Sequence, residues 1–429
     1  MTEITALFQA LERGELDQTL RTLRCGGEVQ AARARVTALV KGFQTAFGKG
    51  EDAQVALLSA PGRTEICGNH TDHQHGRVLA AAVNLDFLAC AAPNGTNTIR
   101  FQSQGWPMVE VTLDGSGPRE DEKESTPALV RGMADRIAGL GYPVAGFDAY
   151  AVSDVLPGSG LSSSAACEVL LGVILNHLFC QDALDAVTIA QIGQYAENVY
   201  FGKPSGLMDQ TASSVGGAVA IDFADPAKPV VRPMQVDLNA AGYALCIIDS
   251  GADHADLTAE YAAIPQDMKG IAGWFGKEVL RQLTQADVLA NLPALRKEFG
   301  DRAVLRALHF FADDQRVEAE ANALEQGDFD TFLALVKESG RSSWMYLQDI
   351  VPAGAVREQA MAVALAVAET ALAGRGAYRV HGGGFAGTIQ VFVPLDMLDQ
   401  FKAQVEPLLG EGSCHVLSIR PVGGAVVWG

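Results

Sequence analysis

The segment from Leu156 to Ala166 constrains this chain more than any other part of its sequence. It reads Leu-Pro-Gly-Ser-Gly-Leu-Ser-Ser-Ser-Ala-Ala, follows a predicted strand at 147–152 and opens a strongly apolar helix predicted at 165–179. Glycines let backbone N–H groups approach an anion closely, and a helix N-terminus adds unpaired donors and partial positive charge. The three consecutive serine hydroxyls can donate to phosphate oxygens or ligate Mg²⁺. The segment therefore predicts a phosphate site, with an ordinary glycine-rich turn capped by serines as the alternative.

Any phosphate site has to be local, because the chain as a whole is acidic. Its 429 residues contain 51 acidic and 32 basic side chains, which gives a formal net charge of −19. A protein with this charge repels a phosphate backbone and an anionic bilayer, so neither nucleic acid nor a membrane is expected as a partner. The segment also lacks the terminal Gly-Lys-Ser/Thr of a Walker A loop, which excludes that class of nucleotide site.

The cysteines and the N-terminus predict a cytoplasmic protein. Seven cysteines are scattered along the chain without a Cys-x-x-Cys pair or zinc-finger spacing, as expected for reduced thiols. The first residues lack the charged and apolar regions of a secretory signal. The sequence also lacks an uncharged apolar run of about 18 residues, the length that a membrane span requires.

The length of the chain predicts two or three packed units. Hydrophobic spacing indicates a helical N-terminal extension at 1–50, an N-terminal domain at 51–230 and a C-terminal domain at 231–429. Further strands are predicted at 55–59, 78–91, 98–102, 109–112, 217–223, 243–249, 378–381, 388–393, 416–419 and 425–428. Further helices are predicted at 126–140, 187–200, 208–215, 303–324 and 357–372.

A second segment, 61–76, places an Arg, two acids and three histidines in one loop-like stretch after a strand. Such a density of polar groups between apolar runs is typical of a site for a hydroxyl-rich ligand, with a solvated loop as the alternative. The histidines lack a supporting Cys or a helical i, i+4 pair, so we do not expect them to bind a metal.

Two further segments carry polar or glycine-rich patterns. Glu197 is followed by Lys-Pro-Ser-Gly-Leu-Met-Asp-Gln at 203–210, where one acid could bind Mg²⁺ and the other could face a substrate hydroxyl. His-Gly-Gly-Gly-Phe-Ala-Gly at 381–387 lies between two predicted strands and permits close approach to a ligand or another loop. By itself, an Asp that follows a Met is more often an ordinary helix residue, and the glycine segment is equally compatible with a plain glycine hairpin.

Together, in this order, the four segments resemble the GHMP kinase superfamily and, more closely, the galactokinase family. Ala60–Arg63 followed by His70-Thr71-Asp72 is similar to the galactokinase signature, and Gly158–Ala166 resembles the phosphate loop. Gly206–Gln210 resembles the Gly-[Ile/Leu]-Met-Asp-Gln segment, and Gly382–Gly387 the C-terminal glycine motif. The resemblance spans residues 55–395.

This resemblance implies an α+β fold with two domains, the first of the ribosomal protein S5 domain 2 type and the second ferredoxin-like, with the active site between them. It implies transfer of the ATP γ-phosphoryl group to O1 of a sugar. By this resemblance Asp209 accepts or orients the proton of the sugar hydroxyl, and Arg63 stabilises developing charge. Mg²⁺ would be held by Glu197 with Ser163 or Ser164. The ATP phosphates would be wrapped by Gly158, Ser159, Gly160, Leu161, Ser162, Ser163 and Ser164. The sugar would be contacted by Asn69, His70, Asp72, Gly206 and Tyr261.

The sequence also departs from the family pattern. Galactokinases usually carry Glu-His-Thr-Asp-Tyr, whereas this chain has Asn69 and His73 at the first and last of these positions. A neutral Asn repels a carboxylate on C6 of the sugar less than Glu does, and plant galacturonate kinases look similar here. The hypotheses are therefore a galactokinase, a kinase for a C6-altered sugar such as galacturonate, and a non-catalytic sugar and ATP sensor. Both a monomer and a dimer remain open.

Overall fold

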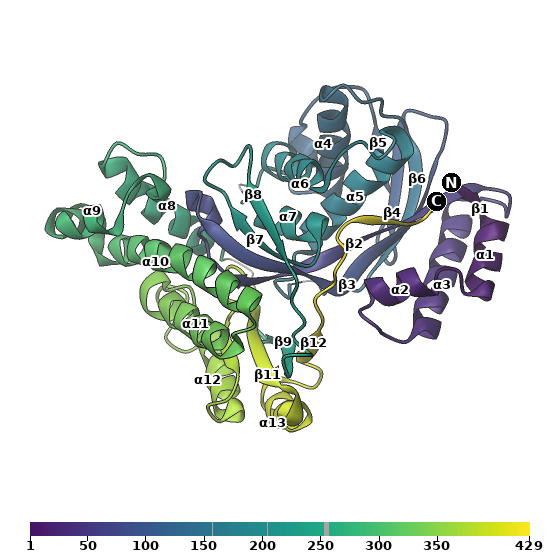
Figure 1. Ribbon diagram of the computed structural model, residues 1–429. Helices are drawn as coiled ribbons and strands as arrows, with labels where there is room; N and C mark the ends of the chain where they lie inside the picture. The colour runs from purple at the N-terminus through teal and green to yellow at the C-terminus, as the bar shows by residue number, and fades with distance from the viewer. Residues whose placement is uncertain (157, 204, 253–256) are drawn as a thin grey trace.

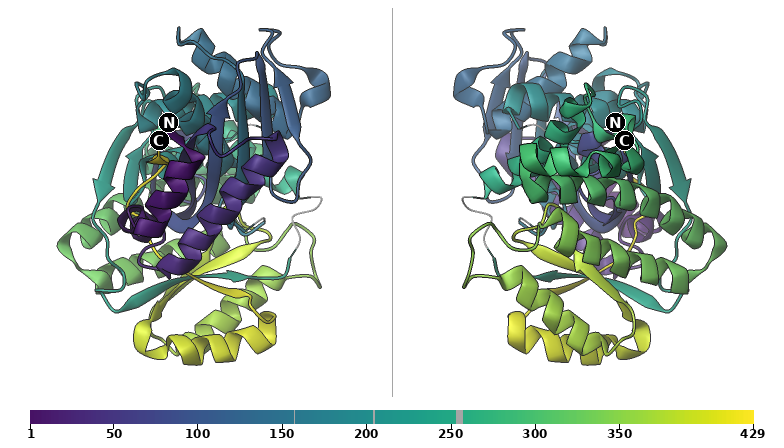
Figure 2. Two further views of the ribbon diagram at one scale, coloured as in Figure 1. Left: turned by 90° about the vertical axis from the view of Figure 1, so that its right-hand side faces the viewer. Right: turned by 90° about the vertical axis from the view of Figure 1, so that its left-hand side faces the viewer.

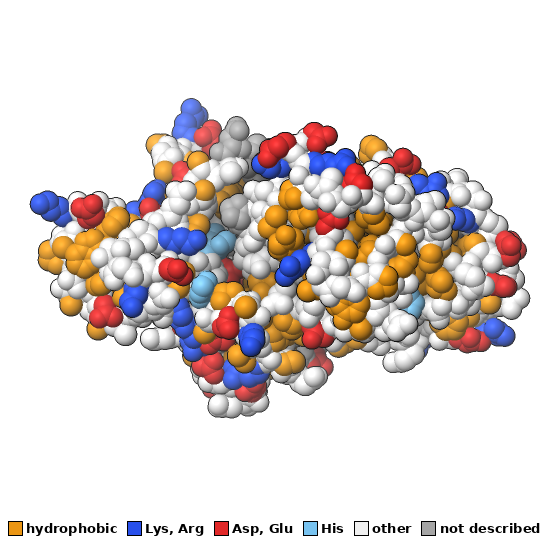
Figure 3. Space-filling model, turned by 90° about the horizontal axis from the view of Figure 1, so that it is seen from above, with side chains coloured by type: hydrophobic (Ala, Val, Ile, Leu, Met, Phe, Trp, Pro, Cys, Tyr) orange, Lys and Arg blue, Asp and Glu red, His pale blue; other side chains and the backbone are white. Residues whose placement is uncertain are grey.

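The computed structural model describes residues 1–156, 158–203, 205–252 and 257–429. It contains two β-sheets with helices packed around them (Figure 1). Among the described residues, no helix is both long and apolar enough to cross a membrane. Acidic and basic side chains are interspersed over the face seen in Figure 3.

The larger sheet is built around two long antiparallel strands, β2 (Gln54–Cys67) and β3 (Arg77–Pro93). Its main path runs β1-β2-β3-β6-β4-β5, and β7, β8 and β13 are attached to it beside this path. The remaining strands of this sheet are β1 (Thr2–Glu3), β4 (Thr98–Ser103), β5 (Val109–Thr112), β6 (Phe147–Ser153), β7 (Ala218–Asp222), β8 (Val230–Met234) and β13 (Ala425–Trp428).

Helices cover both faces of this sheet, because alternate side chains of its strands point to opposite sides. Leu58 of β2 lies in one core with the helices α4 (Thr126–Gly139), α5 (Ser163–Phe179) and α6 (Ala186–Tyr195). Leu57, its neighbour, lies in another core with the N-terminal helices. These are α1 (Ile4–Arg13), α2 (Asp17–Leu23) and α3 (Val29–Phe47).

The N-terminal extension is therefore helical, as predicted, and it covers one face of the larger sheet (Figure 2). A buried ion pair also connects it to the sheet. Arg35 of α3 donates to the fully buried Asp86 of β3 at 2.5 Å, and Arg420 near the C-terminus donates to the same carboxylate at 2.9 Å. A buried carboxylate needs such partners, because an unpaired charge in the interior is costly.

The smaller sheet has the order β10-β11-β9-β12. Its strands are β9 (Tyr243–Asp249), β10 (Ala377–Val380), β11 (Thr388–Pro394) and β12 (Cys414–Leu417). One face packs on α12 (Ala360–Leu372) and α13 (Leu398–Leu409). The other face packs on α10 (Leu292–Gln326), α11 (Phe329–Ser342) and residues of β3, so one continuous core joins the two sheets.

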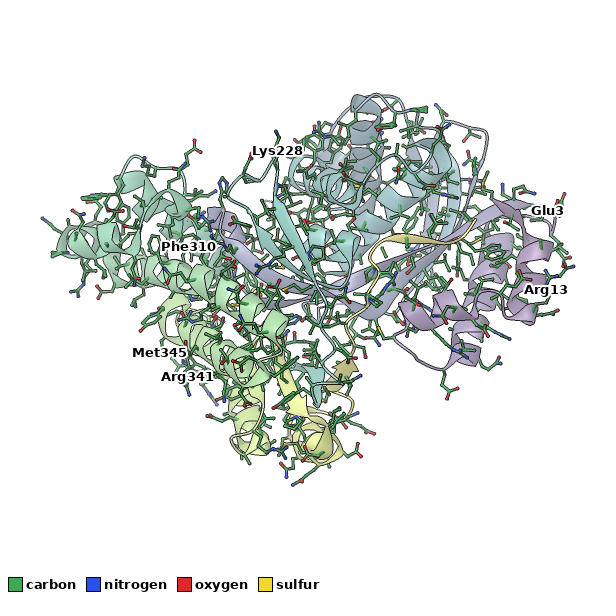
Figure 4. The ribbon with its side chains drawn as sticks, viewed as in Figure 1. Glu3, Arg13, Lys228, Phe310, Arg341 and Met345 are labelled. Carbon is green, nitrogen blue, oxygen red and sulfur yellow. The ribbon has the colours of Figure 1, made fainter. Side chains whose placement is uncertain are left out.

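A helical arm extends beside the far end of β2 and β3 (Figure 1). It consists of α8 (Thr258–Trp274), α9 (Gln285–Ala290) and the first part of α10, which breaks at Gly300. The backbone N–H of Leu280, between α8 and α9, donates to Oε1 of Gln74 at 3.1 Å. The arm therefore contacts the segment 61–76, which we call the sugar segment. Phe310 of α10 (Figure 4), beyond the break, lies next to Gly76 of the same segment.

Several predicted elements differ from the structure. The segment 61–76 is not one loop, because Pro61–Cys67 continue strand β2 and only the remainder turns, through the 3₁₀ turn Asp72–Gln74. Three of these strand residues, Arg63, Thr64 and Glu65, are polar, yet they are buried, and Thr64 and Glu65 bond to residues of the smaller sheet. The predicted helix at 187–200 ends at Tyr195 and widens into a π-helical turn, Ala196–Phe201. Strand β8 was not predicted.

The domain boundaries 1–50, 51–230 and 231–429 stay a prediction. Strands from both ends of the chain belong to the larger sheet, since β1 pairs with the first two residues of β2 and β13 pairs with β2 at Leu57–Ser59. Neither pairing could be read from the sequence.

Candidate active site

Arg63 and Asp209 meet in a bidentate ion pair. Arg63 lies on β2, and Asp209 lies in the first turn of α7 (Met208–Val215). Nε and Nη2 of Arg63 donate to the two carboxylate oxygens at 2.7 and 2.6 Å. The Arg63 side chain is only 7% exposed but that of Asp209 is 29% exposed, so a ligand can still reach the carboxylate.

The pKa of Asp209 lies below its ordinary value. Burial raises this pKa. The charge and hydrogen bonds of Arg63, a hydrogen bond from Ser162 and the charge of Lys203 together lower it by more than burial raises it. Asp209 is therefore ionised at neutral pH, as a hydrogen-bond acceptor for a substrate hydroxyl must be.

The predicted phosphate loop runs directly beside Arg63. The backbone N–H of Arg63 donates to the carbonyl of Leu161 at 3.0 Å, and Nη1 donates to the carbonyl of Gly160. Ser162 has a left-handed backbone (φ 55°), after which α5 begins at Ser163. The structure thus places this loop at the N-terminus of a long apolar helix, as predicted. Pro157, part of the same segment, lies outside the described residues.

Glu197 lies in the π-helical turn after α6 and is 4% exposed. One carboxylate oxygen accepts from Lys203 Nζ at 3.3 Å, and the other accepts from Gln210 Nε2 at 2.9 Å. Gln210 directly follows Asp209 in α7. The candidate metal ligand, Glu197, is therefore hydrogen-bonded to the residue next to the candidate base, Asp209.

Glu168 belongs to the same cluster, and sequence reasoning missed it. Gln210 Nε2 donates to its carboxyl at 2.9 Å, so one amide bridges Glu168 and Glu197. Burial and the neighbouring Glu197 raise the pKa of Glu168 well above its usual value. The available signal was its position four residues after Ser164, on the same face of the predicted helix.

Three predicted sugar contacts converge on the C-terminal glycine segment. Nδ2 of Asn69 donates to the carbonyl of Gly382 at 2.9 Å, and Nε2 of His70 lies 3.1 Å from the carbonyl of Gly383. The Tyr261 hydroxyl donates to the carbonyl of Gly384 at 2.8 Å. Three consecutive carbonyls of the glycine segment thus hold two adjacent residues, Asn69 and His70, and a third, Tyr261, from helix α8.

Asn69 and His70 are more enclosed than a surface loop would be. Asn69 is fully buried, and its Oδ1 is left without a hydrogen-bond partner among the described residues. Burial and neighbouring His73 lower the pKa of His70 to about 3, so the ring is neutral. Within the described parts of the chain, no group of His, Cys, Asp and Glu side chains has an arrangement able to hold a metal by itself.

Asp72 and Gly206 are in direct contact. A Cβ atom at Gly206 would collide with Oδ2 of Asp72, so this contact requires glycine. The backbone N–H of His73 donates to the other oxygen of Asp72 at 2.9 Å. The contact brings the sugar segment against the turn that precedes Asp209.

Two buried residues of α10 support the sugar segment and were not predicted. Asp313 accepts from the backbone N–H groups of Gly68 and Asn69 at 3.2 and 3.1 Å. Nε2 of His309 lies 3.1 Å from the carbonyl oxygen of Asn69. Both lie over 200 residues from the segment they hold, so no local pattern could indicate their role.

Comparison with known proteins agrees with this geometry. A model of the GHMP kinase N-terminal domain matches residues 128–217, and a model of the galactokinase galactose-binding signature matches residues 41–93. The chain is 32% identical over 353 residues to a galactokinase of Streptomyces coelicolor, covering 82% of this chain and 87% of that protein. It is 32% identical over 355 residues to a galactokinase of Mycobacterium tuberculosis, covering 79% and 88%.

Among solved structures, the fold is similar to that of Lactococcus lactis galactokinase in complex with galactose. The TM-score is 0.78 at 25% sequence identity, and the match covers 91% of this chain and 99% of the other.

Proposed function

Because this chain belongs to the galactokinase family of the GHMP kinases, we propose that it transfers the γ-phosphoryl group of ATP to the anomeric hydroxyl of galactose. The predicted two-domain GHMP kinase fold is confirmed, and the protein is an ATP-dependent sugar kinase. The roles of individual residues are our proposal.

The Arg63–Asp209 pair carries this proposal, because it lies between the phosphate loop and the sugar segment. Asp209 orients the O1 hydroxyl and takes its proton as O1 bonds to the γ-phosphorus and the bond to the β–γ bridging oxygen breaks. A carboxylate with a lowered pKa is a weak base, which suits a loose transition state in which the proton leaves late. Arg63 fixes the carboxylate and faces the charge that develops on the transferred group.

The residues present fit a Mg²⁺ ion that arrives with ATP. Mg²⁺ is usually bound through one or two carboxylates, waters and substrate phosphates, so Glu197 alone supplies the necessary protein charge. The Lys203 side chain that pairs with Glu197 is 61% exposed and can be displaced. Ser163 or Ser164, at the start of α5, would add a hydroxyl. The bound ion would neutralise phosphate charge.

For the sugar, we propose contacts from Asn69, His70, Asp72, Gly206 and Tyr261. The unpartnered Oδ1 of Asn69 can accept from a sugar hydroxyl, and Asp72 beside Gly206 can accept from another. The glycine carbonyls already use Asn69 Nδ2, His70 Nε2 and the Tyr261 hydroxyl, which fixes the orientation of these side chains before a sugar binds.

A coupled ADP-release assay with galactose, galacturonate, glucose and N-acetylgalactosamine tests the proposal. Galactose is expected to give the highest kcat/KM. Absence of turnover with every sugar would contradict the kinase assignment, which would return the non-catalytic sensor to consideration.

One observation favours a second acceptor, galacturonate. Asn69 is neutral where galactokinases usually carry Glu, so a carboxylate at C6 would meet less repulsion. A kcat/KM for galacturonate well above that for galactose would replace galactose as the substrate in this proposal.

We also propose that the enzyme works in the cytoplasm. All seven cysteines are free thiols in the structure, in keeping with a reducing compartment. Fractionation of cells that express the chain, followed by immunodetection, would test this location.

A further inference from the structure

The two residues that flank the C-terminal glycine segment hold the phosphate loop. The Thr388 hydroxyl, at the start of β11, donates to the carbonyl oxygen of Ser159 at 2.6 Å. His381, just after β10, has Nδ1 at 2.9 Å from the same Thr388 hydroxyl. The smaller sheet therefore contacts the phosphate loop through the side-chain hydroxyl of Thr388 and not only through the packing of glycines.

The donors and acceptors in this chain of hydrogen bonds are fixed by simple counting. A hydroxyl carries one proton, and Thr388 gives it to Ser159, so Thr388 must accept from His381 Nδ1–H. The other ring nitrogen, Nε2, lies 3.0 Å from the Thr64 hydroxyl of β2. In the neutral ring Nε2 is then the acceptor, so Thr64 donates to it.

Gln390 lies at the other end of this series of hydrogen bonds. Its Nε2 donates to the Thr64 hydroxyl at 2.7 Å and to the carbonyl oxygen of Glu65 at 2.9 Å. Because a carbonyl oxygen can only accept, this contact requires the amide nitrogen at that position. All the hydrogen bonds from Gln390 to Ser159 therefore run in one direction, and they fix one tautomer of His381.

The surroundings of His381 favour the neutral ring. The side chain is buried, and burial together with the charges of Arg63 and Arg379 lowers its pKa to about 3. A proton on Nε2 would leave the Thr64 hydroxyl without its acceptor.

The His381 ring also limits where the loop can lie. A Cβ atom at Gly160 would lie 2.9 Å from Nδ1 of His381, so the loop backbone passes directly over the ring. On its other side, the carbonyl of Gly160 accepts from Arg63. Ser159 and Gly160 are thus held between β2 of the larger sheet and the ends of β10 and β11 of the smaller sheet.

We propose that His381 and Thr388 are positioning residues for the nucleotide, which hold Ser159 and Gly160 in the conformation that binds the ATP phosphates. This inference rests on the proposed function of the loop. Neither residue touches the reacting atoms, so their loss weakens nucleotide binding more than it affects the sugar.

Thr388→Val tests the proposal, because valine keeps the shape of threonine and removes only the hydroxyl. We expect the Kd of MgATP, measured by calorimetry, to rise about tenfold, the effect of one lost hydrogen bond. Thr388→Ser restores the hydroxyl and is expected to bind MgATP within about twofold of the wild type. The KM for galactose should change little in both variants.

Ser214→Ala is the matched control. The Ser214 hydroxyl also donates from a buried position to a backbone carbonyl, that of Ala186, at 2.7 Å, but in a different part of the domain. We expect Ser214→Ala to lower the melting temperature about as much as Thr388→Val does, without a change in the Kd of MgATP. If Thr388→Val does not fold, Thr64→Val removes the donor to the other nitrogen of His381 and should weaken MgATP binding in the same way.

An unchanged Kd in folded Thr388→Val would overturn the proposal, as would a Thr388→Ser variant that binds as weakly as the valine variant. These outcomes are separate from failure of the proposed function. If the proposed function is wrong, the wild-type protein itself will bind no MgATP or will phosphorylate no sugar.

Discussion

The guanidinium of Arg63 donates two parallel hydrogen bonds, of 2.7 and 2.6 Å, to the carboxylate of Asp209. The two residues are 146 positions apart, and the pair joins the middle of β2 to the first turn of α7. The same guanidinium donates to the phosphate loop at Gly160. One side chain therefore sets the distance between the proposed base and the phosphate donor.

Asp209→Asn should abolish most turnover while MgATP binding persists. The amide cannot accept the hydroxyl proton, and it leaves Arg63 without its charged partner, so kcat should fall by about 10²–10⁴. Coupled ADP release measures kcat, and calorimetry measures MgATP binding. A kcat within about tenfold of the wild type, a smaller loss than removal of a general base causes, would contradict the role given to Asp209.

Gly206→Ala should raise the KM for galactose, because the added methyl group collides with the Asp72 carboxylate. Displacing Asp72 removes a proposed sugar contact and shifts the turn before Asp209, so kcat should fall as well. Gly139→Ala is the control, since a Cβ there meets nothing within 4 Å at the end of α4. If both variants have wild-type kinetics, the contact between Gly206 and Asp72 does not serve the sugar site.

Glu197→Gln should raise the Mg²⁺ concentration required for half-maximal activity. The substitution removes the buried charge proposed to bind the ion while keeping its shape. Glu168→Gln should have a far smaller effect, because burial and Glu197 already hold the pKa of Glu168 high and its carboxyl neutral. Mg²⁺ titrations at saturating ATP and galactose compare the two variants. Equal effects would argue against Glu197 as the ligand.

His381 should contribute to the loss of folding stability at acid pH. Burial and the charges of Arg63 and Arg379 lower its pKa to about 3, against the opposing effects of a hydrogen bond to the Ser159 backbone and of the charge of Asp209. A histidine with a lowered pKa in the folded state contributes stability that is present above about pH 6.5 and is lost as the pH falls towards 3.

The melting temperature should therefore fall between pH 6.5 and 4.5, with His381 contributing at most about 1.4 kcal/mol per pH unit. His381→Asn, which cannot gain a proton, should show a shallower fall even if it starts from a lower melting temperature. Circular dichroism melts at several pH values measure this slope. A slope as steep as that of the wild type would assign the acid sensitivity to other groups.

Much of the fold followed from local patterns. The helical N-terminal extension and most strands are found where spacing and turns predicted them, because periodicity reports which side chains one backbone element buries. The exception at 61–67 is informative. Its polar residues indicated a loop, yet Arg63, Thr64 and Glu65 are strand residues whose partners come from elsewhere in the chain.

The class of chemistry could be predicted from the sequence, because the Gly-Ser loop before an apolar helix and the segments that carry Arg63, Asp72 and Asp209 together resemble one family of kinases. Which side chains meet in the site depends on the tertiary structure. It placed Glu168 and Gln210 beside Glu197, Asp313 and His309 behind Asn69, and Thr388 on the phosphate loop. The physical reason is that these contacts depend on how two sheets and α10 pack together, whereas a sequence pattern reports only the conformation and burial of its own element.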